Sequence, residues 1–350
     1  MNTCKTMVTP LSAVDLALVN GWQHDFPLVR EPFACIAQAL GLDESDVLSS
    51  YARLQREGVV SRIGGVFAPG AGGAALLAAM SVPAQRMGEV AAIVSAHPGV
   101  NHNYEREHQW NLWFVMTGRS APEVTAAIDA LELATGLTTL RLRMERAYRI
   151  DLGFDLRHAT AVQPMRSARA VQTEAIARDA WPLAQCVETG LPVMARPFDG
   201  WADTLGSAPG HVLDTLQCWL ETGTLKRFGV VVRHHELGFM SNAMTVFDVP
   251  DALVDACGEA LAQQPGVTLA YRRERASQWP YNLYCMVHGT DRAIVGKVID
   301  RVTAAAGLGP HPRSVLFSTR RFKQTGARRF RGLADAPSQA VVAGACHAVV

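Results

Sequence analysis

The chain has 350 residues, of which 49% are hydrophobic and 19% charged, and its formal net charge at pH 7 is +1. This length and composition suffice for the cores of roughly two to four domains, but they exclude the surplus of positive charge that holds a nucleic-acid backbone. All but four of the 33 basic residues are arginine, whose planar guanidinium suits bidentate binding of carboxylates.

The cysteines and the hydropathy pattern exclude several further classes of protein. The seven cysteines form no Cys-x-x-Cys pair, which argues against a disulfide framework and against a structural zinc or iron–sulfur site. No apolar run approaches ~18 residues, and the N-terminus has no basic region followed by an apolar core, so neither a membrane span nor a signal peptide is predicted. We expect a cytoplasmic protein with no membrane partner and no metal of its own.

In chain order, residues 10–62 predict three helices and a wing. Apolar side chains at helical spacing mark the first and third helices, and Pro32 opens the second. Gly58 stands where the third helix ends. This plan is typical of a winged helix-turn-helix, and it recurs at 174–227.

Residues 63–155 predict a strand, a helix, two strands, a helix and a strand, which is the order of a ferredoxin-like domain. The expected elements are 76–82, 85–96, 101–107, 110–117, 122–134 and 139–145. Residues 228–325 repeat this order, with elements at 244–249 and 253–264, a strand pair around Tyr271 and Leu283, and then 293–306 and 314–318. A linker is expected at 156–173 and a poorly ordered tail at 331–350.

The two halves are a duplication. The matching segments, in the same order in both halves, are 30–33 with 195–198, 62–66 with 227–231, 98–106 with 265–273, and 111–113 with 282–284. A repeat of this length indicates duplicated domains and not a solenoid. The predicted fold class is therefore α+β, a tandem duplication of a winged helix-turn-helix plus a ferredoxin-like domain. Such a covalent pseudo-dimer can carry an asymmetric site at its internal interface.

This domain plan resembles the Lrp/AsnC transcription factors, so DNA binding is the first function to test. A helix that reads the major groove needs donors for bases and phosphates. The third helix of the first unit offers only Arg53 and Arg56, and the segment 210–222 in the second contains no arginine or lysine. The sequence therefore predicts no nucleic-acid partner.

A closer resemblance is carried by longer motifs. Residues 99–106 (Gly-Val-Asn-His-Asn-Tyr-Glu-Arg) and 111–114, with the wing at 62–64, resemble one subunit of the siroheme decarboxylases. Residues 227–229, 233–234, 242–244, 279–283 and 286–289 resemble the partner subunit. The likeness covers nearly all of 10–325, and order, spacing and duplication make it specific.

The resemblance implies a fused, two-subunit siroheme decarboxylase of haem d1 biosynthesis. Such enzymes remove carbon dioxide from two acetate side chains of siroheme to give 12,18-didecarboxysiroheme. It implies siroheme as partner and no cofactor, since the iron belongs to the substrate. Homologous decarboxylase subunits or a homo-oligomer are further expected partners.

The residue types fit that chemistry. A flat macrocycle with carboxylates around its edge needs aromatic faces and several arginines. The residues predicted to bind substrate are Arg62, Tyr104, Arg106, Asn111, Trp113, Arg227, Arg233, Tyr271, Arg273, Trp279 and Asn282. Surface solvation is the alternative role for the arginines, and core packing is the alternative for the aromatics.

Loss of carbon dioxide leaves electron density on a carbon that must gain a proton, and a side chain with a pKa near neutrality is the natural donor. His102 is the first catalytic candidate. His234 is the second, and it could also ligate the siroheme iron. His235 is an alternative, and His108 and His288 are weaker candidates.

The halves differ at this position, since the second has Leu269 where the first has His102. We therefore expect the second copy of the site to lack its proton donor. Two other functions remain open on the sequence: a regulator that senses haem or another tetrapyrrole, and an assembly subunit that holds siroheme for another enzyme.

Overall fold

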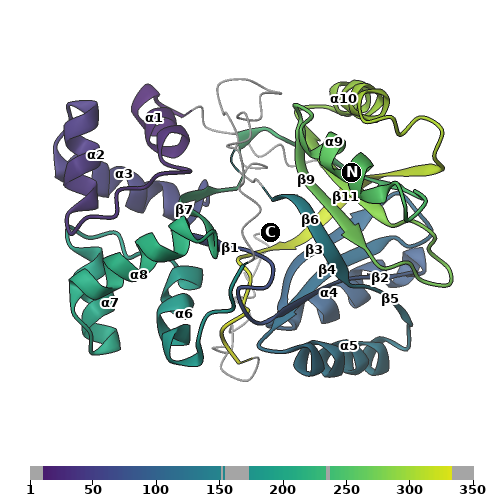
Figure 1. Ribbon diagram of the computed structural model, residues 1–350, viewed down its shortest axis with the longest axis horizontal. Coiled ribbons are helices and arrows are strands. Elements are labelled where there is room, and N and C mark those ends of the chain that lie inside the picture. Colours follow the sequence, from purple (N-terminus) through teal and green to yellow (C-terminus); the bar gives the residue numbers. More distant parts are fainter. Residues whose placement is uncertain (1–10, 151–152, 154–172, 234–236, 333–350) are drawn as a thin grey trace, which may run out of the picture.

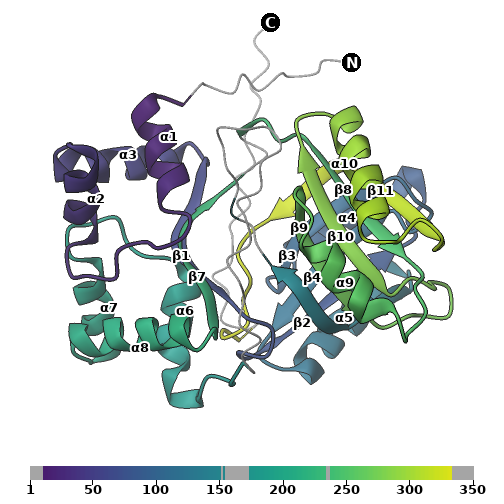
Figure 2. The same ribbon diagram turned by 45° about the horizontal axis from the view of Figure 1, so that its top comes forward.

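The computed structural model describes residues 11–150, 153, 173–233 and 237–332. The predicted linker and tail fall almost entirely outside these ranges, and His234 and His235 lie outside them as well. Figures 1 and 2 show the helical units on one side of the molecule and a large sheet on the other.

Each half begins with three helices and a strand, as predicted. These elements are α1 (Ala13–Gly21), α2 (Pro32–Leu40), α3 (Glu44–Arg56) and β1 (Val60–Phe67) in the first half, and α6 (Trp181–Thr189), α7 (Pro197–Leu205), α8 (Pro209–Glu221) and β7 (Leu225–Val232) in the second. Strands β1 and β7 pair with each other in antiparallel fashion. The domain boundaries predicted at 62 and 227 fall inside these strands, because each wing strand continues along its partner from the other half.

The repeated glycine of the wing motif permits close packing. Gly64 and Gly229 face each other across the β1–β7 pair. A Cβ atom on Gly229 would lie 2.5 Å from the carbonyl oxygen of Trp22, and one on Gly64 would lie 2.7 Å from that of Val187. A side chain at either position would therefore push the wing away from the helical units, with which it shares one hydrophobic core.

The remaining strands form one nine-stranded sheet in the order β5-β2-β4-β3-β11-β8-β10-β9-β6. Its first-half elements are β2 (Ala74–Met80), a 3-10 turn (Ala84–Arg86), α4 (Met87–Ala96), β3 (Val100–Arg106), β4 (Leu112–Gly118), α5 (Ala121–Thr135), β5 (Thr139–Leu142) and β6 (Met144–Ile150). The second half supplies β8 (Ser241–Phe247), α9 (Val254–Ala262), β9 (Val267–Arg273), β10 (Leu283–Gly289), α10 (Arg292–Ala305) and β11 (Arg313–Gln324). The four helices cover one face of this sheet, and the other face turns toward the wings (Figure 1).

The last strand of each half crosses into the other half. β5 pairs with β2, and after Arg143 the chain continues as β6 along β9. β11 pairs with β8 up to Phe317 and then with β3 from Ser318 onward. The sequence predicted only the first part of each strand, because the second part is stabilised by an edge from the other half. No helix in the described part of the chain is long and apolar enough to cross a membrane.

Candidate active site

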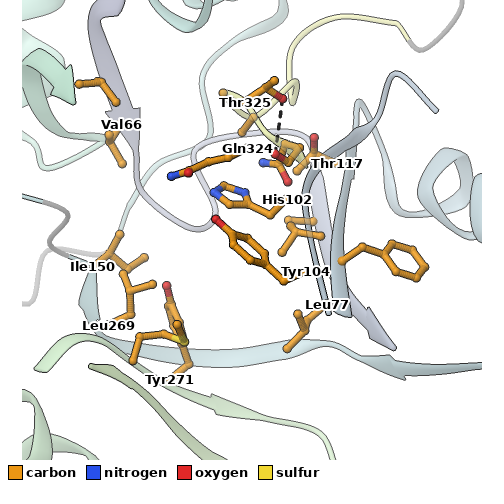
Figure 3. Close-up of a pocket in the computed structure, with 18 of the residues that line it drawn as sticks. Val66, Leu77, His102, Tyr104, Thr117, Ile150, Leu269, Tyr271, Gln324 and Thr325 are labelled. Carbon is orange, nitrogen blue, oxygen red and sulfur yellow. Dashed lines mark hydrogen bonds between the residues drawn. The ribbon is translucent and has the colours of Figure 1, made fainter. Parts of the chain in front are cut away.

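A cavity of about 330 Å³ lies between the wing pair and the sheet, within the usual size of small-molecule sites. Both halves line it, and so does the chain that follows β11. In Figure 3, His102 and Tyr104 project into it from one side, with Leu269 and Tyr271 on the other. A second, more polar cavity of about 230 Å³ shares Arg62, Arg233 and Glu188 with it.

Matching strands of the two halves present matching side chains. Alternation along β3 directs His102, Tyr104 and Arg106 to the cavity, and β9 presents Leu269, Tyr271 and Arg273 in the same order. β4 and β10 do the same with Trp113, Val115 and Thr117, and with Tyr284, Met286 and His288. The cavity thus consists of two related halves, and the sequence differences between them make it asymmetric.

Six arginines line the cavity: Arg62, Arg106, Arg227, Arg233, Arg273 and Arg329. Glu188 is the one carboxylate among the described lining residues. Burial lowers the pKa of Arg106 to about 10, which leaves it protonated at neutral pH, and burial also lowers the pKa of Arg62 and Arg273. A site that concentrates buried cations in this way is suited to a ligand with several negative charges.

The arginines are held by backbone carbonyls. Arg106 Nη1 donates to Leu316 O at 3.0 Å, and Arg227 Nη1 donates to Gln23 O at 2.7 Å. Arg227 Nη1 also donates to Val230 O at 3.4 Å. These contacts fix the position of each guanidinium while leaving other N–H groups of Arg106 for a ligand.

Glu188 anchors the chain after β11 to the wall of the cavity. Its carboxylate oxygens accept the backbone N–H groups of Arg329 and Phe330, at 2.9 and 3.3 Å. Burial raises the pKa of Glu188, and these hydrogen bonds together with Arg329 and Arg62 oppose the rise. We infer that Glu188 positions this segment and so brings Arg329 to the cavity.

Aromatic rings provide flat apolar surfaces beside the charges. The guanidinium of Arg106 lies 5.5 Å from the ring centroid of Tyr104, and that of Arg273 lies 5.1 Å from Tyr271. Burial raises the pKa of Tyr271 to about 12, so its phenol is neutral and able to donate a hydrogen bond. The arrangement accommodates a planar ligand whose edge carries anions.

His102 is half-buried and nearly parallel to Tyr104, with ring centroids 6.3 Å apart. Its pKa is lowered to about 4, first by burial and then by the positive charges of Arg62 and Arg106. Burial and these two charges therefore favour the neutral imidazole at pH 7, so the predicted role of His102 as proton donor requires negative charge beside the ring. A bound anion would raise this pKa by offsetting the arginine charges.

Three of the predicted substrate-binding residues do not line the cavity. Asn111 is occupied by both backbone groups of Val82, with hydrogen bonds of 2.8 Å, and Asn282 holds Val249 in the same way. Trp279 is buried against Trp113, with ring centroids 5.1 Å apart. Asn111 and Asn282 recur because each clamps the backbone, and Trp279 serves core packing. His234, the second catalytic candidate, lies outside the described residues.

The catalytic candidate His102 lines the cavity. So do the other eight residues predicted to bind substrate: Arg62, Tyr104, Arg106, Trp113, Arg227, Arg233, Tyr271 and Arg273. Sequence reasoning missed Gln324, the last residue of β11, and also Thr325 and Arg329, which follow that strand. It ranked His288 low, although His288 lines the cavity. Alternation along β10 from Tyr284 was the signal that could have identified it. In the described ranges, no group of three or more His, Cys, Asp or Glu residues could hold a metal ion.

Comparisons with known proteins agree with this architecture. The model of the siroheme decarboxylase NirDL-like HTH domain matches residues 15–60, and that of the AsnC-like ligand binding domain matches 71–149 and 236–323. The siroheme decarboxylase NirDL subunit of Paracoccus denitrificans is 41% identical over 318 residues, which covers 90% of this chain and 96% of that protein. The siroheme decarboxylase NirL subunit of Stutzerimonas stutzeri is 50% identical over 150 residues, covering 43% of this chain and 88% of that subunit.

A solved structure extends the likeness to three dimensions. The crystal structure of the siroheme decarboxylase NirDL in complex with an iron-uroporphyrin III analogue superposes with a TM-score of 0.63 and 26% identity, covering 91% of this chain and 93% of that one. The predicted fold class and family are confirmed. The chain belongs to the siroheme decarboxylase family.

Proposed function

We propose that this protein decarboxylates siroheme, converting two acetate side chains to methyl groups in the formation of 12,18-didecarboxysiroheme for haem d1. The observation that carries the proposal is the ratio of six arginines to one carboxylate around a cavity lined by Tyr104 and Tyr271. Family membership supports the same activity, since the relatives matched over nearly the whole chain are siroheme decarboxylases.

The arginines bind and orient the substrate. Arg62, Arg106 and Arg273 meet carboxylates on the macrocycle edge, and the tyrosines pack against its faces. Carboxylates that remain on the product bind equally before and after the reaction, so they orient the ring. The acetate that reacts should instead lie in a part of the cavity with fewer cations, because there the loss of its negative charge as carbon dioxide leaves is favourable.

His102 supplies the proton. The bond between the acetate methylene and its carboxylate breaks, carbon dioxide leaves, and the electron pair remains on the ring-attached carbon. The proton of the His102 imidazolium is delivered to that carbon, which becomes a methyl group, and solvent reprotonates the neutral imidazole. Substrate carboxylates beside Arg62 and Arg106 raise the pKa of His102 and so make the ring a donor only when substrate is present.

No cofactor of the protein's own is required for this chemistry, because the reaction is non-oxidative and the iron arrives within the substrate. That His234 ligates the siroheme iron stays a prediction. Homologous decarboxylase subunits or further copies of this chain remain proposed partners.

The regulator alternative has less support. The relatives matched over 90% of the chain are decarboxylases, and Arg53, one of two basic residues on α3, is paired with Asp15 at 2.5 Å. The test is anaerobic incubation of the purified protein with siroheme, followed by mass spectrometry. Masses lower by two carbon dioxide units support the decarboxylase, whereas unchanged siroheme bound at stoichiometry would favour a sensor or an assembly subunit.

A further inference from the structure

The second cavity, of about 230 Å³, adjoins the first and has residues of its own. Its wall is formed by the start of β1, the end of α6, the residue after β7 and the segment 325–331. Arg62 and Arg233 border both cavities, whereas Arg328 and Arg331 border only the second. The second cavity can therefore be altered at two arginines without a change in the lining of the first.

The wall of the second cavity is strongly cationic. Four arginines and one carboxylate, that of Glu188, are found among its described lining residues. Both oxygens of Glu188 already accept backbone N–H groups, those of Arg329 and Phe330. Because like charges in a confined space repel one another, an anion that binds between them is stabilised. The four arginines are Arg62, Arg233, Arg328 and Arg331.

Two of these guanidinium groups have buried N–H groups that the protein does not pair. The Nε atoms of Arg62 and Arg233 are buried and have no hydrogen-bond partner in the described ranges. Arg62 uses another nitrogen, Nη2, to donate to Gly65 O at 3.2 Å. A Cβ atom on Gly326 would lie 3.0 Å from Arg62 Nη1, so this glycine leaves the guanidinium room between the two cavities. Buried donors without an acceptor are costly, which favours an acceptor supplied by a ligand.

The chemistry of the wall indicates the class of ligand. Guanidinium groups bind coplanar oxygens through two parallel N–H donors, and Ser61, Thr189 and Thr325 add hydroxyl groups. A small ligand with coplanar oxygens and a negative charge matches this wall. Bicarbonate has this form, and it arises when carbon dioxide released by a decarboxylase is hydrated in water.

We propose that the second cavity binds a small oxyanion of the bicarbonate type, and that the shared Arg62 couples this site to substrate binding. An anion in the second cavity offsets part of the charge with which Arg62 attracts a substrate carboxylate in the first. Oxyanion binding therefore weakens substrate binding, and by reciprocity substrate weakens oxyanion binding by the same factor. The link to released carbon dioxide rests on the proposed decarboxylation, whereas the binding of the oxyanion does not.

Arg331→Gln and Arg328→Gln test the site in the full-length protein, because each removes a cation that borders only the second cavity. The segment that carries both residues stays anchored, since Phe330 is fully buried and lies against Phe67 with ring centroids 4.9 Å apart. Arg56→Gln is the matched control. It removes the same charge from an exposed position on α3 that borders neither cavity.

The first measurement is the binding of carbon-13-labelled bicarbonate to the substrate-free protein, followed by the width of its NMR line, with chloride at equal ionic strength as the reference. We expect saturable binding to wild type and to Arg56→Gln. Arg331→Gln and Arg328→Gln should each lose affinity roughly 10- to 100-fold, because each lacks one charge-assisted hydrogen bond. No saturable binding by wild type, or equal affinity in all four proteins, would overturn the proposal.

The second measurement is absorption titration with iron uroporphyrin III, which carries acetate and propionate carboxylates, at rising bicarbonate concentration. We expect the Kd of wild type to rise about 5- to 20-fold and then to level off, because both ligands can be bound at once. Arg331→Gln should have nearly the wild-type Kd without bicarbonate and show little rise with it. A Kd that rises without limit would contradict the proposal, since the two ligands would then compete for one place.

The outcome for catalysis is separate. A wild type that gives both expected binding results but releases no carbon dioxide from siroheme would refute the proposed function and leave the oxyanion site in place.

Discussion

Arg106 and Arg273 occupy equivalent positions in the two halves, and each is held by the half to which it does not belong. Arg106 Nη1 donates to Leu316 O of the second half, and Arg273 Nη1 donates to Leu142 O of the first, both at 3.0 Å. Both side chains are buried, with 6% and 8% exposed. The fusion of two halves therefore sets the geometry of the cations in the cavity.

Arg106→Lys should weaken siroheme binding although the charge is kept. A lysine ammonium that meets the substrate carboxylate cannot also reach Leu316 O in the planar arrangement of a guanidinium. Loss of one charge-assisted hydrogen bond costs about 1.5–3 kcal/mol, or roughly a 10- to 100-fold rise in Kd. Absorption titration with siroheme measures this change in Kd.

Arg292→Lys serves as the control for this measurement. Arg292 is exposed and pairs with Glu107 in a bidentate geometry away from the cavity. Its replacement should leave Kd unchanged. Identical titration curves for Arg106→Lys and wild type would remove Arg106 from the substrate site.

Asn111→Ala should affect stability and leave substrate affinity intact. The side chain satisfies both the N–H and the C=O of Val82, and loss of these bonds costs about 1–3 kcal/mol for each group left unpaired. Thermal unfolding and siroheme titration of the same preparation separate the two effects. A large loss of affinity in molecules that remain folded would restore the predicted substrate role.

The fold was largely predictable because its signals are local or repeated. Helix periodicity, the proline at position 32 and the duplicated segments predicted the three-helix units and the ferredoxin-like domains. The crossing of β6 and β11 was not predictable, because the hydrogen bonds that stabilise it come from β9 and β3 of the other half. Nothing within one repeat shows that its last strand continues past the domain.

The site was predictable where suitable residue types recur at matching positions of the two halves. Tyr104 and Arg106 on β3, and Tyr271 and Arg273 on β9, were identified from the repeat and from the family motifs. Asn111 also recurs in both halves, but its side chain bonds the backbone of Val82. Repetition alone does not distinguish a binding residue from a structural one. Arg329 was missed because its position depends on Glu188, distant in sequence and unmarked by any motif.

The protein should bind DNA only non-specifically. Arg53 on α3 is engaged by Asp15 and Glu57 at 2.5 and 3.2 Å, and α8 carries no arginine or lysine. The few remaining cations predict weak binding that salt abolishes. Mobility-shift assays with random duplexes at increasing salt test this expectation, and sequence-dependent nanomolar binding would contradict it.

Leu269→His should supply a proton donor to the second half of the cavity. The new histidine would stand on β9 at the position that His102 has on β3, beside Tyr271 in place of Tyr104. Leu269→His combined with His102→Asn should therefore release more carbon dioxide than His102→Asn alone, whereas Leu269→Ala combined with His102→Asn should not. Equal product masses for the two double variants, each binding siroheme normally, would contradict the equivalence of the two positions.

Substrate binding should be accompanied by proton uptake at His102. Burial and the charges of Arg62 and Arg106 lower the pKa of His102 to about 4, so without substrate the ring is mostly neutral at pH 6. Substrate carboxylates offset both arginines and raise the pKa, which favours the charged ring. Protons are therefore taken up between pH 4 and the pKa of the complex. Above that second pKa the donor is lost, and the rate of the His102-dependent step should fall as pH rises.

Calorimetric titration at pH 6 in two buffers of different ionisation enthalpy measures this uptake, with a non-reactive analogue that carries the same carboxylates in place of siroheme. His102→Asn should bind the analogue with less proton uptake than wild type, by the fraction that His102 accounts for. Arg62→Gln should raise the pKa of His102 in the protein without substrate, because one of the two charges that lower it is gone. Equal uptake by wild type and His102→Asn would show that substrate does not charge His102, and would require another route for the proton.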